Sequence, residues 1–185
     1  MSNLAKRLDA HFVACAAAAG AAAFGVAQNA EAAIVHSGPV NIVIPDNIDG
    51  IYMNIVTGAT GTTSGVAGWD INPYTAGLPD SGMFLWGPTA NTWFSTTGNV
   101  PNASGFVLPA GTPIGGAATA FFRPGGTALT GITLSSSDNL LGFRFVNEAN
   151  ANQVHHGWLR LQFGATAGVR SIVEYAYEDV AGASI

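Results

Sequence analysis

The sequence is poor in cysteine and in lysine, and both absences limit what the protein can be. Its 185 residues contain one cysteine, Cys15, and one lysine, Lys6. No disulfide can form within the chain, so its stability has to come from apolar burial and backbone hydrogen bonds. Lys and Arg number 6 against 11 Asp and Glu, for a formal net charge of −5. A protein that follows nucleic-acid phosphates needs clustered basic residues, and we therefore expect no nucleic-acid partner.

Charged residues of either sign are scarce. They make up 9% of the chain, whereas soluble domains contain about 25%. Hydrophobic residues account for 48% and there are 24 glycines, so the surface has to be covered largely by Thr, Ser, Asn and Gly. Such a surface is typical of an extracellular protein, and the length suits one hydrophobic core.

The sequence has a single long apolar run, residues 12–27, which is too short to span a bilayer comfortably. Lys6 and Arg7 precede the run, and Ala30, Glu31 and Ala32 follow it with small residues at the −3 and −1 positions of a cleavage site. This order predicts a helical signal peptide over residues 1–32 and a single domain over residues 33–185. The alternative is an Ala-rich amphipathic helix of the mature protein, but no polar face recurs at helical spacing.

Removal of the leader changes the composition that matters for function. Taking residues 1–32 from 185 leaves 153, with no cysteine, no lysine, four arginines and nine of the eleven acids. No other long apolar segment is present, so we expect no membrane span in the mature chain. The expected location is extracellular or at the cell surface.

The remainder of the sequence predicts β structure. No window shows a sustained helical period, whereas short alternating stretches are bounded by Gly, Pro, Asn or Asp. Residues 40–44 and 51–56 are predicted to be neighbouring strands joined by a turn. Between residues 57 and 130 we expect short strands at four apolar clusters, residues 66–71, 83–86, 106–108 and 120–122.

The C-terminal third carries the clearest strand pattern. Three successive stretches, 140–146, 158–163 and 171–178, alternate apolar and polar residues and predict an antiparallel meander. The predicted inward residues are Leu141, Phe143, Phe145, Leu159, Leu161, Phe163, Val173, Tyr175 and Tyr177. The opposite face then holds Arg144 and Arg160 near Glu174 or Glu178, which we interpret as a solvated ion-pair ladder rather than a binding site. Together the segments predict an all-β protein, a two-sheet antiparallel β-sandwich of jelly-roll-like topology.

The sequence offers little support for catalysis. The domain holds His36 and the adjacent pair His155 and His156, without a Gly-x-Ser-x-Gly elbow or a cysteine, so we predict no nucleophilic enzyme. A glycan-active hydrolase needs two facing carboxylates, and no motif selects such a pair. Neighbouring strand residues point to opposite faces, and we therefore expect one of the paired histidines to be packed and the other solvated. A zinc or copper pair is the alternative.

Two groups of residues are candidates for binding. Asp46, Asn47 and Asp49 precede Gly50 and resemble a calcium loop, but a turn in which Asp46 or Asn47 bonds its own backbone explains the same residues. Four tryptophans and one acid could hold a sugar ring by stacking and hydrogen bonding, although most such rings pack in the core. These candidate residues are Trp69, Asp70, Trp86, Trp93 and Trp158.

Six short segments together resemble a group of uncharacterised secreted bacterial proteins. They are SGPVN (37–41), IPDNIDGIY (44–52), GWDINPY (68–74), GFRF (142–145), HGW (156–158) and YAYE (175–178). Many members of that group carry a C-terminal sorting tail of the PEP-CTERM type. The resemblance implies a Gram-negative exported protein associated with the cell surface or with extracellular polymer, and it implies no activity. The present sequence ends at Gly182-Ala183-Ser184-Ile185 without such a tail, which favours release or self-assembly over sorting by that route.

These observations favour a non-enzymatic, secreted structural or interaction protein, and self-assembly through exposed strand edges is one way in which it would act. The alternative is a lectin-like carbohydrate-binding module assisted by calcium. Apart from calcium, we expect no cofactor. The expected partners are copies of the protein itself or an extracellular polysaccharide.

Overall fold

The computed structural model describes residues 33–75, 82–88, 92–94, 105–115, 121–122 and 127–185. The chain divides into two compact units, Met1–Glu31 and Ala32–Ile185. The predicted signal peptide lies outside the described residues, and the fold below is that of the second unit. The prediction of an all-β protein is confirmed there, because the one helical element among the described residues is the short 3-10 helix η1 (Glu148–Asn150). None of the helical structure in these ranges is long and apolar enough to cross a membrane.

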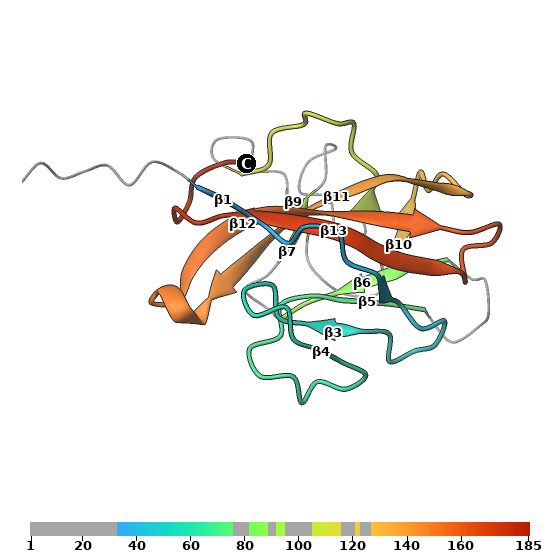
Figure 1. The fold of residues 1–185 in the computed structure, drawn as a ribbon, viewed down its shortest axis with the longest axis horizontal. Coiled ribbons are helices and arrows are strands. Elements are labelled where there is room, and N and C mark those ends of the chain that lie inside the picture. The colour runs from blue at the N-terminus through green and yellow to red at the C-terminus, as the bar shows by residue number, and fades with distance from the viewer. Residues whose placement is uncertain (1–32, 76–81, 89–91, 95–104, 116–120, 123–126) are drawn as a thin grey trace, which may run out of the picture. The chain divides into compact units, whose positions relative to one another are not determined.

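The largest sheet has seven strands in the order β1-β13-β12-β11-β7-β9, with β2 also paired to β13 (Figure 1). Its strands are β1 (Ile34–His36), β2 (Ile42–Val43), β7 (Thr92–Phe94), β9 (Phe121–Phe122), β11 (Ser136–Asn147), β12 (Gln153–Phe163) and β13 (Arg170–Glu178). All its pairings are antiparallel. The predicted meander of the three C-terminal strands is therefore confirmed.

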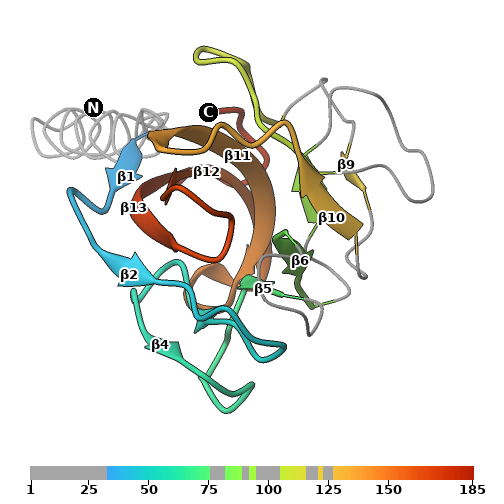
Figure 2. The same cartoon turned by 90° about the vertical axis from the view of Figure 1, so that its right-hand side faces the viewer.

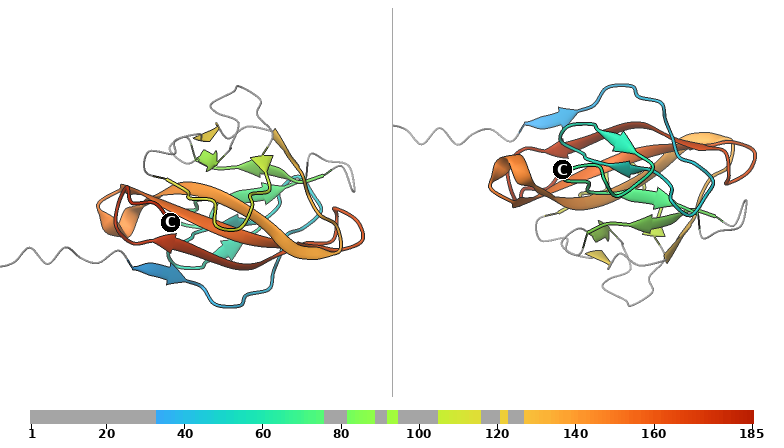
Figure 3. Two further views of the ribbon diagram at one scale, coloured as in Figure 1. Left: turned by 90° about the horizontal axis from the view of Figure 1, so that it is seen from above. Right: turned by 90° about the horizontal axis from the view of Figure 1, so that it is seen from below.

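The described residues also form two smaller sheets. One has the order β5-β6-β10-β8, with β8 and β10 parallel, and the other pairs β3 with β4. Their strands are β3 (Tyr52–Met53), β4 (Thr60–Gly61), β5 (Asn72–Tyr74), β6 (Phe84–Trp86), β8 (Gly105–Phe106) and β10 (Thr127–Thr130). In Figure 1 and Figure 2, β5 and β6 lie on one side of the long strands, and Figure 3 shows the same elements from above and below.

The main hydrophobic core is built by side chains from all three sheets. β11 and β12 contribute the predicted residues Leu141, Phe143, Phe145, Leu159, Leu161 and Phe163, each at most 2% exposed. The smaller sheets and their flanking loops contribute Met53, Ile71, Met83, Leu85 and Leu129. Because side chains alternate in direction along a strand, one face of the long strands packs in the core and the other face lies outside it.

The predicted inward face of β13 is correct only in its second half. Glu174 pairs with Arg160, but the next partner pair is Ile172 with Leu161, so Val173 is an extra residue in a β-bulge. A bulge of one residue reverses the side-chain alternation. Ile172 is therefore fully buried, whereas the predicted core residue Val173 is only partly buried.

The predicted pairing of residues 40–44 with 51–56 is wrong. β2 pairs with β13, and β3 pairs with β4. The intervening turn carries the chain to residues 71–73, where Ile51 N donates to Pro73 O at 3.2 Å and Met53 N donates to Ile71 O at 2.9 Å. The segment 40–44 thus pairs with a strand far away in sequence, and the segment 51–56 pairs with the nearby β4 and with residues 71–73 instead of with residues 40–44.

In the middle of the chain, three of the four apolar clusters contain short strands, β6, β8 and β9. The cluster at 66–71 does not form a strand, although Ile71 makes an isolated bridge to Met53. Instead, Asn54 Nδ2 donates to Ala67 O and Gly68 O at 3.1 and 2.7 Å, which holds the cluster in a bend.

Candidate functional site

A cleft of about 850 Å³ lies on the face of the large sheet that points away from the main core. Its floor is formed by Leu140 of β11, Trp158 and Arg160 of β12, and Glu174 of β13, which alternate with the core-facing residues. One wall is the segment 108–114, and Ser184 and Ile185 form another. The cleft therefore combines three strands with the distant segment 108–114 and with the C-terminal residues that follow β13.

Backbone hydrogen bonds hold the first wall over the sheet. Leu108 N donates to Leu140 O at 2.8 Å, and Ile114 and Ile185 exchange two bonds of 2.9 and 3.0 Å. Leu108 and Ile114 are each 4% exposed, and Leu140, Trp158 and Ile185 pack against them. In this second hydrophobic cluster, side chains of the wall pack directly against side chains of the floor.

His156 supports the wall from behind. Its Nδ1 lies 2.6 Å from Ala183 O, and because a carbonyl oxygen only accepts, Nδ1 carries the hydrogen. Gly115 has a φ of +100°, and a Cβ built there would lie 2.4 Å from the His156 ring. Burial lowers the pKa of His156 below its ordinary value, with a further contribution from the nearby charge of Arg144, although the bond to Ala183 acts in the opposite direction. The ring is therefore a neutral packing element with one donor.

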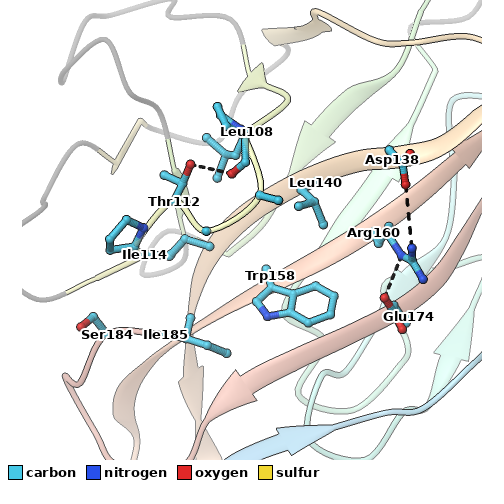
Figure 4. A pocket seen from close by; sticks show the side chains of 14 residues that line it. Leu108, Thr112, Ile114, Asp138, Leu140, Trp158, Arg160, Glu174, Ser184 and Ile185 are labelled. Atoms are coloured by element: carbon cyan, nitrogen blue, oxygen red, sulfur yellow. Dashed lines mark hydrogen bonds and ion pairs between the residues drawn. The ribbon is translucent and has the colours of Figure 1, made fainter.

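A row of charged side chains crosses one end of the cleft (Figure 4). Arg160 Nε lies 2.7 Å from Glu174 Oε1, and the two residues are direct cross-strand partners. Asp138 Oδ1 is 3.9 Å from Arg160 Nη1, and His36 Nε2 is 3.3 Å from Glu174 Oε2. The predicted contact of Arg160 with Glu174 is confirmed. Glu178 is not part of a solvated ladder, because it is 3% exposed and its Oε1 accepts from Val180 N at 3.1 Å. A cross-strand pair of opposite charges contributes about 0.2–1 kcal/mol.

Trp158 occupies the centre of the floor. Figure 4 shows its indole between the apolar side chains of the wall and the charged row. The ring is partly buried, and the ring of His36 lies 5.7 Å from it at an interplanar angle of 42°. The arrangement offers a flat apolar surface beside polar groups that can donate and accept hydrogen bonds, which is how concave sites orient a ligand.

No model of a protein family matches the chain, and no similar protein was found among curated sequences or solved structures.

The other predicted aromatic residues do not converge on this cleft. Trp93 is 2% exposed and packs against Phe143, so this ring belongs to the core. Trp69 contacts Tyr52 edge to face, with ring centroids 4.9 Å apart. Trp86 is 43% exposed, on the side of β6 opposite the buried Leu85.

Asp70 is a buried structural acid. It is 1% exposed, and its Oδ2 accepts a hydrogen bond from Ile55 N at 2.8 Å. A carboxylate in this position closes the loop between residues 55 and 70. The Oδ2 atom of Asp70 therefore faces the backbone of this loop and not the cleft.

The residues of the predicted calcium loop form a turn. Asn47 Oδ1 accepts from Asp49 N and Gly50 N at 3.1 and 2.9 Å, and Gly50 has a φ of +58°. The interpretation as a turn bonded to its own backbone is thus confirmed. Asp46 Oδ1 lies 3.2 Å from the buried guanidinium of Arg170. The described residues contain no group of three or more His, Cys, Asp or Glu that could hold a metal ion.

The adjacent histidines lie on β12, which begins at Gln153, before the predicted strand 158–163, and they point to opposite faces. Both are buried, at 0% and 6% exposed, so the expectation that one is solvated is wrong. His155 faces the core against Phe145, and its Nδ1 donates to Glu178 O at 2.8 Å. His156 is covered because Gly115 and Ala183 pack over the outer sheet face, and sequence alone could not indicate this contact.

Of the predicted binding residues, only Trp158 lies in the cleft. Sequence analysis missed the residues that surround it: Leu108, Pro109, Thr112, Pro113, Ile114, Asp138, Leu140, Ser184 and Ile185. Strand alternation placed Arg160 on the outer face in the prediction, and it could have placed Leu140 there as well. Nothing in the sequence indicated that the segment 108–114 crosses that face.

Proposed function

We propose that the protein is an exported, non-catalytic binding protein whose cleft over Trp158 holds a saccharide unit of an extracellular polymer. The observation that carries the proposal is the partly exposed indole between an apolar wall and the row of Asp138, Arg160 and Glu174. A sugar ring has an apolar C–H face and a rim of hydroxyl groups. The indole matches the first, and the charged groups match the second.

The charged row favours binding over hydrolysis. A typical glycoside hydrolase needs one carboxyl group that gives up a proton and a second that stays ionised. Here Asp138 and Glu174 lie 3.9 and 2.7 Å from the same guanidinium, an arrangement that supports hydrogen bonding to a ligand rather than hydrolysis. An uncharged saccharide also suits a protein with 9% charged residues, which does not steer ionic ligands by a strong field.

Export and surface location are part of this proposal. They rest on the predicted leader over residues 1–32, on the small share of charged residues, 9% of the chain, and on the resemblance to secreted bacterial proteins. We further propose a two-sheet sandwich of jelly-roll type for the domain, because the large and small sheets share one core. In such an architecture the outer sheet faces and the connecting loops are the surfaces available to a polymer.

Binding is tested with the mature protein on an array of neutral and acidic glycans, followed by calorimetry on any positive oligosaccharide. We expect Trp158→Ala to weaken binding about thirtyfold, the equivalent of about 2 kcal/mol for an aromatic anchor. Trp86→Ala is the matched control, because this ring is exposed on a different sheet. It should leave the affinity unchanged.

Trp158 also packs against the second hydrophobic cluster, so a second variant separates binding from folding. The side chain of Asp138 is 86% exposed, and Asp138→Asn should weaken binding while the melting temperature stays unchanged. A blank array with a correctly folded protein refutes the saccharide proposal. Binding that Trp86→Ala abolishes and Trp158→Ala spares would place the site elsewhere.

A second candidate function is self-association through the edge of the large sheet. β1 ends the strand order, and its Ile34 and Val35 are 60% and 41% exposed. A strand edge presents unpaired backbone groups, and lysine, which commonly protects such edges, is absent after residue 6. Sedimentation at increasing concentration tests this function. A protein that stays monomeric excludes it, whereas Ile34→Lys should dissociate any oligomer that forms.

A further inference from the structure

Ala33 and Asp179 hold each other at the point where the chain enters the large sheet. Ala33 N donates to Asp179 Oδ1 at 2.8 Å, and Asp179 N donates to Ala33 O at 3.1 Å. The next residue, Ile34, is already a partner of Glu178 in the ladder between β1 and β13. Among the described residues, Ala33 is therefore the first that the sheet binds, and a carboxylate holds its backbone nitrogen.

The sequence places a cleavage signal directly before this contact. Ala30 and Ala32 supply the small residues that a signal peptidase accepts, and Ala33 follows them. The compact unit that contains the sheet begins at Ala32, and Ala33 is exposed. Cleavage before Ala33 leaves every hydrogen bond between β1 and β13 in place.

We propose that the bond between Ala32 and Ala33 is the processing site, and that Asp179 is the built-in receptor for the ammonium group that cleavage creates. This inference rests on the export in the proposed function, but not on the saccharide cleft. Hydrolysis adds water across the peptide bond, giving a carboxylate on Ala32 and an ammonium on Ala33. The nitrogen atom that donates to Asp179 as an amide then carries a positive charge against the same oxygen atom.

The surroundings suit a positive charge. The β13 residues opposite β1 are Glu178, the cross-strand partner of Ile34, and Tyr177, the partner of Val35. Burial raises the pKa of Tyr177 above its ordinary value, and the negative charge of Asp179 raises it further. No described Lys or Arg is paired with Asp179, and the new ammonium supplies a cation at the edge strand. Processing thus fastens β1 to β13 by an ion pair that the precursor lacks.

The first experiment locates the cleavage. The full chain is produced in a Gram-negative host, and the intact mass of the exported protein is measured. We expect a chain that begins at Ala33. Ala32→Phe should block processing because it fills the −1 position, whereas Glu31→Gln at the −2 position should be processed normally. A mature protein that starts elsewhere overturns the proposed site.

The second experiment uses the absence of lysine. Lys6 is the only lysine in the sequence, so the processed chain has one primary amine, its own terminus. Reductive methylation with ¹³C then gives a single signal that can be titrated by NMR. We expect Asp179→Asn to lower its titration midpoint by roughly a few tenths of a pH unit, the size an exposed ion pair gives. Asp49→Asn removes the same charge at another exposed position and should leave the midpoint unchanged.

Stability provides an independent readout. A folded-state pKa above the unfolded value stabilises the protein below the unfolded value, and the effect is lost as the pH rises through the folded value. Asp179→Asn should therefore lower the melting temperature at pH 6, and the difference should shrink at about pH 10, above the ordinary range of an α-amino group. Equal midpoints and equal melting curves in the two proteins refute the role of Asp179. If the host retains residues 1–32 but purified signal peptidase cleaves before Ala33, export fails as proposed and the processing site stands.

Discussion

Gly115→Ala is the substitution whose effect the structure defines most closely. Gly115 adopts a φ of +100°, and the added Cβ would lie 2.4 Å from Cγ and Nδ1 of His156. Gly111, in the same wall of the cleft, has a φ of +79° with nothing within 4 Å of its Cβ position. The two glycines share the conformational strain of a positive φ, but only Gly115 meets another side chain.

The magnitudes follow from these two terms. A residue other than glycine in the left-handed region costs about 1–3 kcal/mol, and we expect Gly111→Ala to lose that amount alone. Gly115→Ala adds the cost of overpacking, about 1–3 kcal/mol. If His156 moves aside instead, its bond to Ala183 is lost at a cost of about 1 kcal/mol. The difference between the two variants should therefore be about 1–3 kcal/mol, or roughly 2–12 °C in melting temperature for a domain of this size.

The assay is urea unfolding of both variants, followed by a double-mutant cycle with His156→Ala. Removal of the ring leaves space for the new methyl group, so Gly115→Ala should cost less in the His156→Ala protein than in the wild type. Gly111→Ala should cost the same in both proteins. Equal losses for the two glycine variants, or an additive cycle at Gly115, would show that the wall does not pack on His156 as described.

Three further outcomes are expected. Because burial lowers the pKa of His156, its contribution to stability is present above the ordinary pKa of about 6.5 and is lost as the pH falls toward the pKa in the folded state. Between pH 7.5 and 5, the urea midpoint of His156→Gln should therefore fall less steeply than that of the wild type. Parallel curves for the two proteins would contradict this expectation. Millimolar calcium should leave the melting temperature unchanged, since Asp46 is ion-paired and the Asn47 oxygen accepts two backbone bonds; a rise on calcium addition reinstates the metal hypothesis. Leu161→Ala should lower the free energy of unfolding by about 2–5 kcal/mol because the side chain is fully buried. The control Gln162→Ala, at the exposed neighbouring position, should change it by no more than about 0.5 kcal/mol. Equal unfolding midpoints for the two variants would mean that the strand faces are assigned wrongly.

The long C-terminal strands were predictable because their signal is local. In β11 and β12, alternate residues differ so clearly in polarity that the inward face follows from the pleat alone. The same rule failed in the first half of β13, where the bulge at Val173 shifts the alternation by one residue. A bulge depends on how one strand matches its partner, and the sequence of a single strand does not contain that information.

The binding candidates show the same limit. The four tryptophans are equivalent as sequence signals, but their environments differ. Trp93 lies in the core, Trp69 contacts Tyr52 edge to face, Trp86 is on the four-stranded sheet and Trp158 lies in the cleft. Their environments depend on contacts between distant segments. The same dependence explains why both adjacent histidines are buried although they point in opposite directions.

Composition and local periodicity alone predicted that the domain after residue 32 is all-β and that its core cannot rely on disulfides. These properties depend on residue types and on the alternation of single strands, which neighbouring residues establish. Only the tertiary structure decided that the segment 108–114 and residues 184–185 close a cleft over Trp158, and that Ala33 meets Asp179. Such contacts join positions separated by up to 146 residues, and their free energy comes from side chains that have no relation along the chain until it folds.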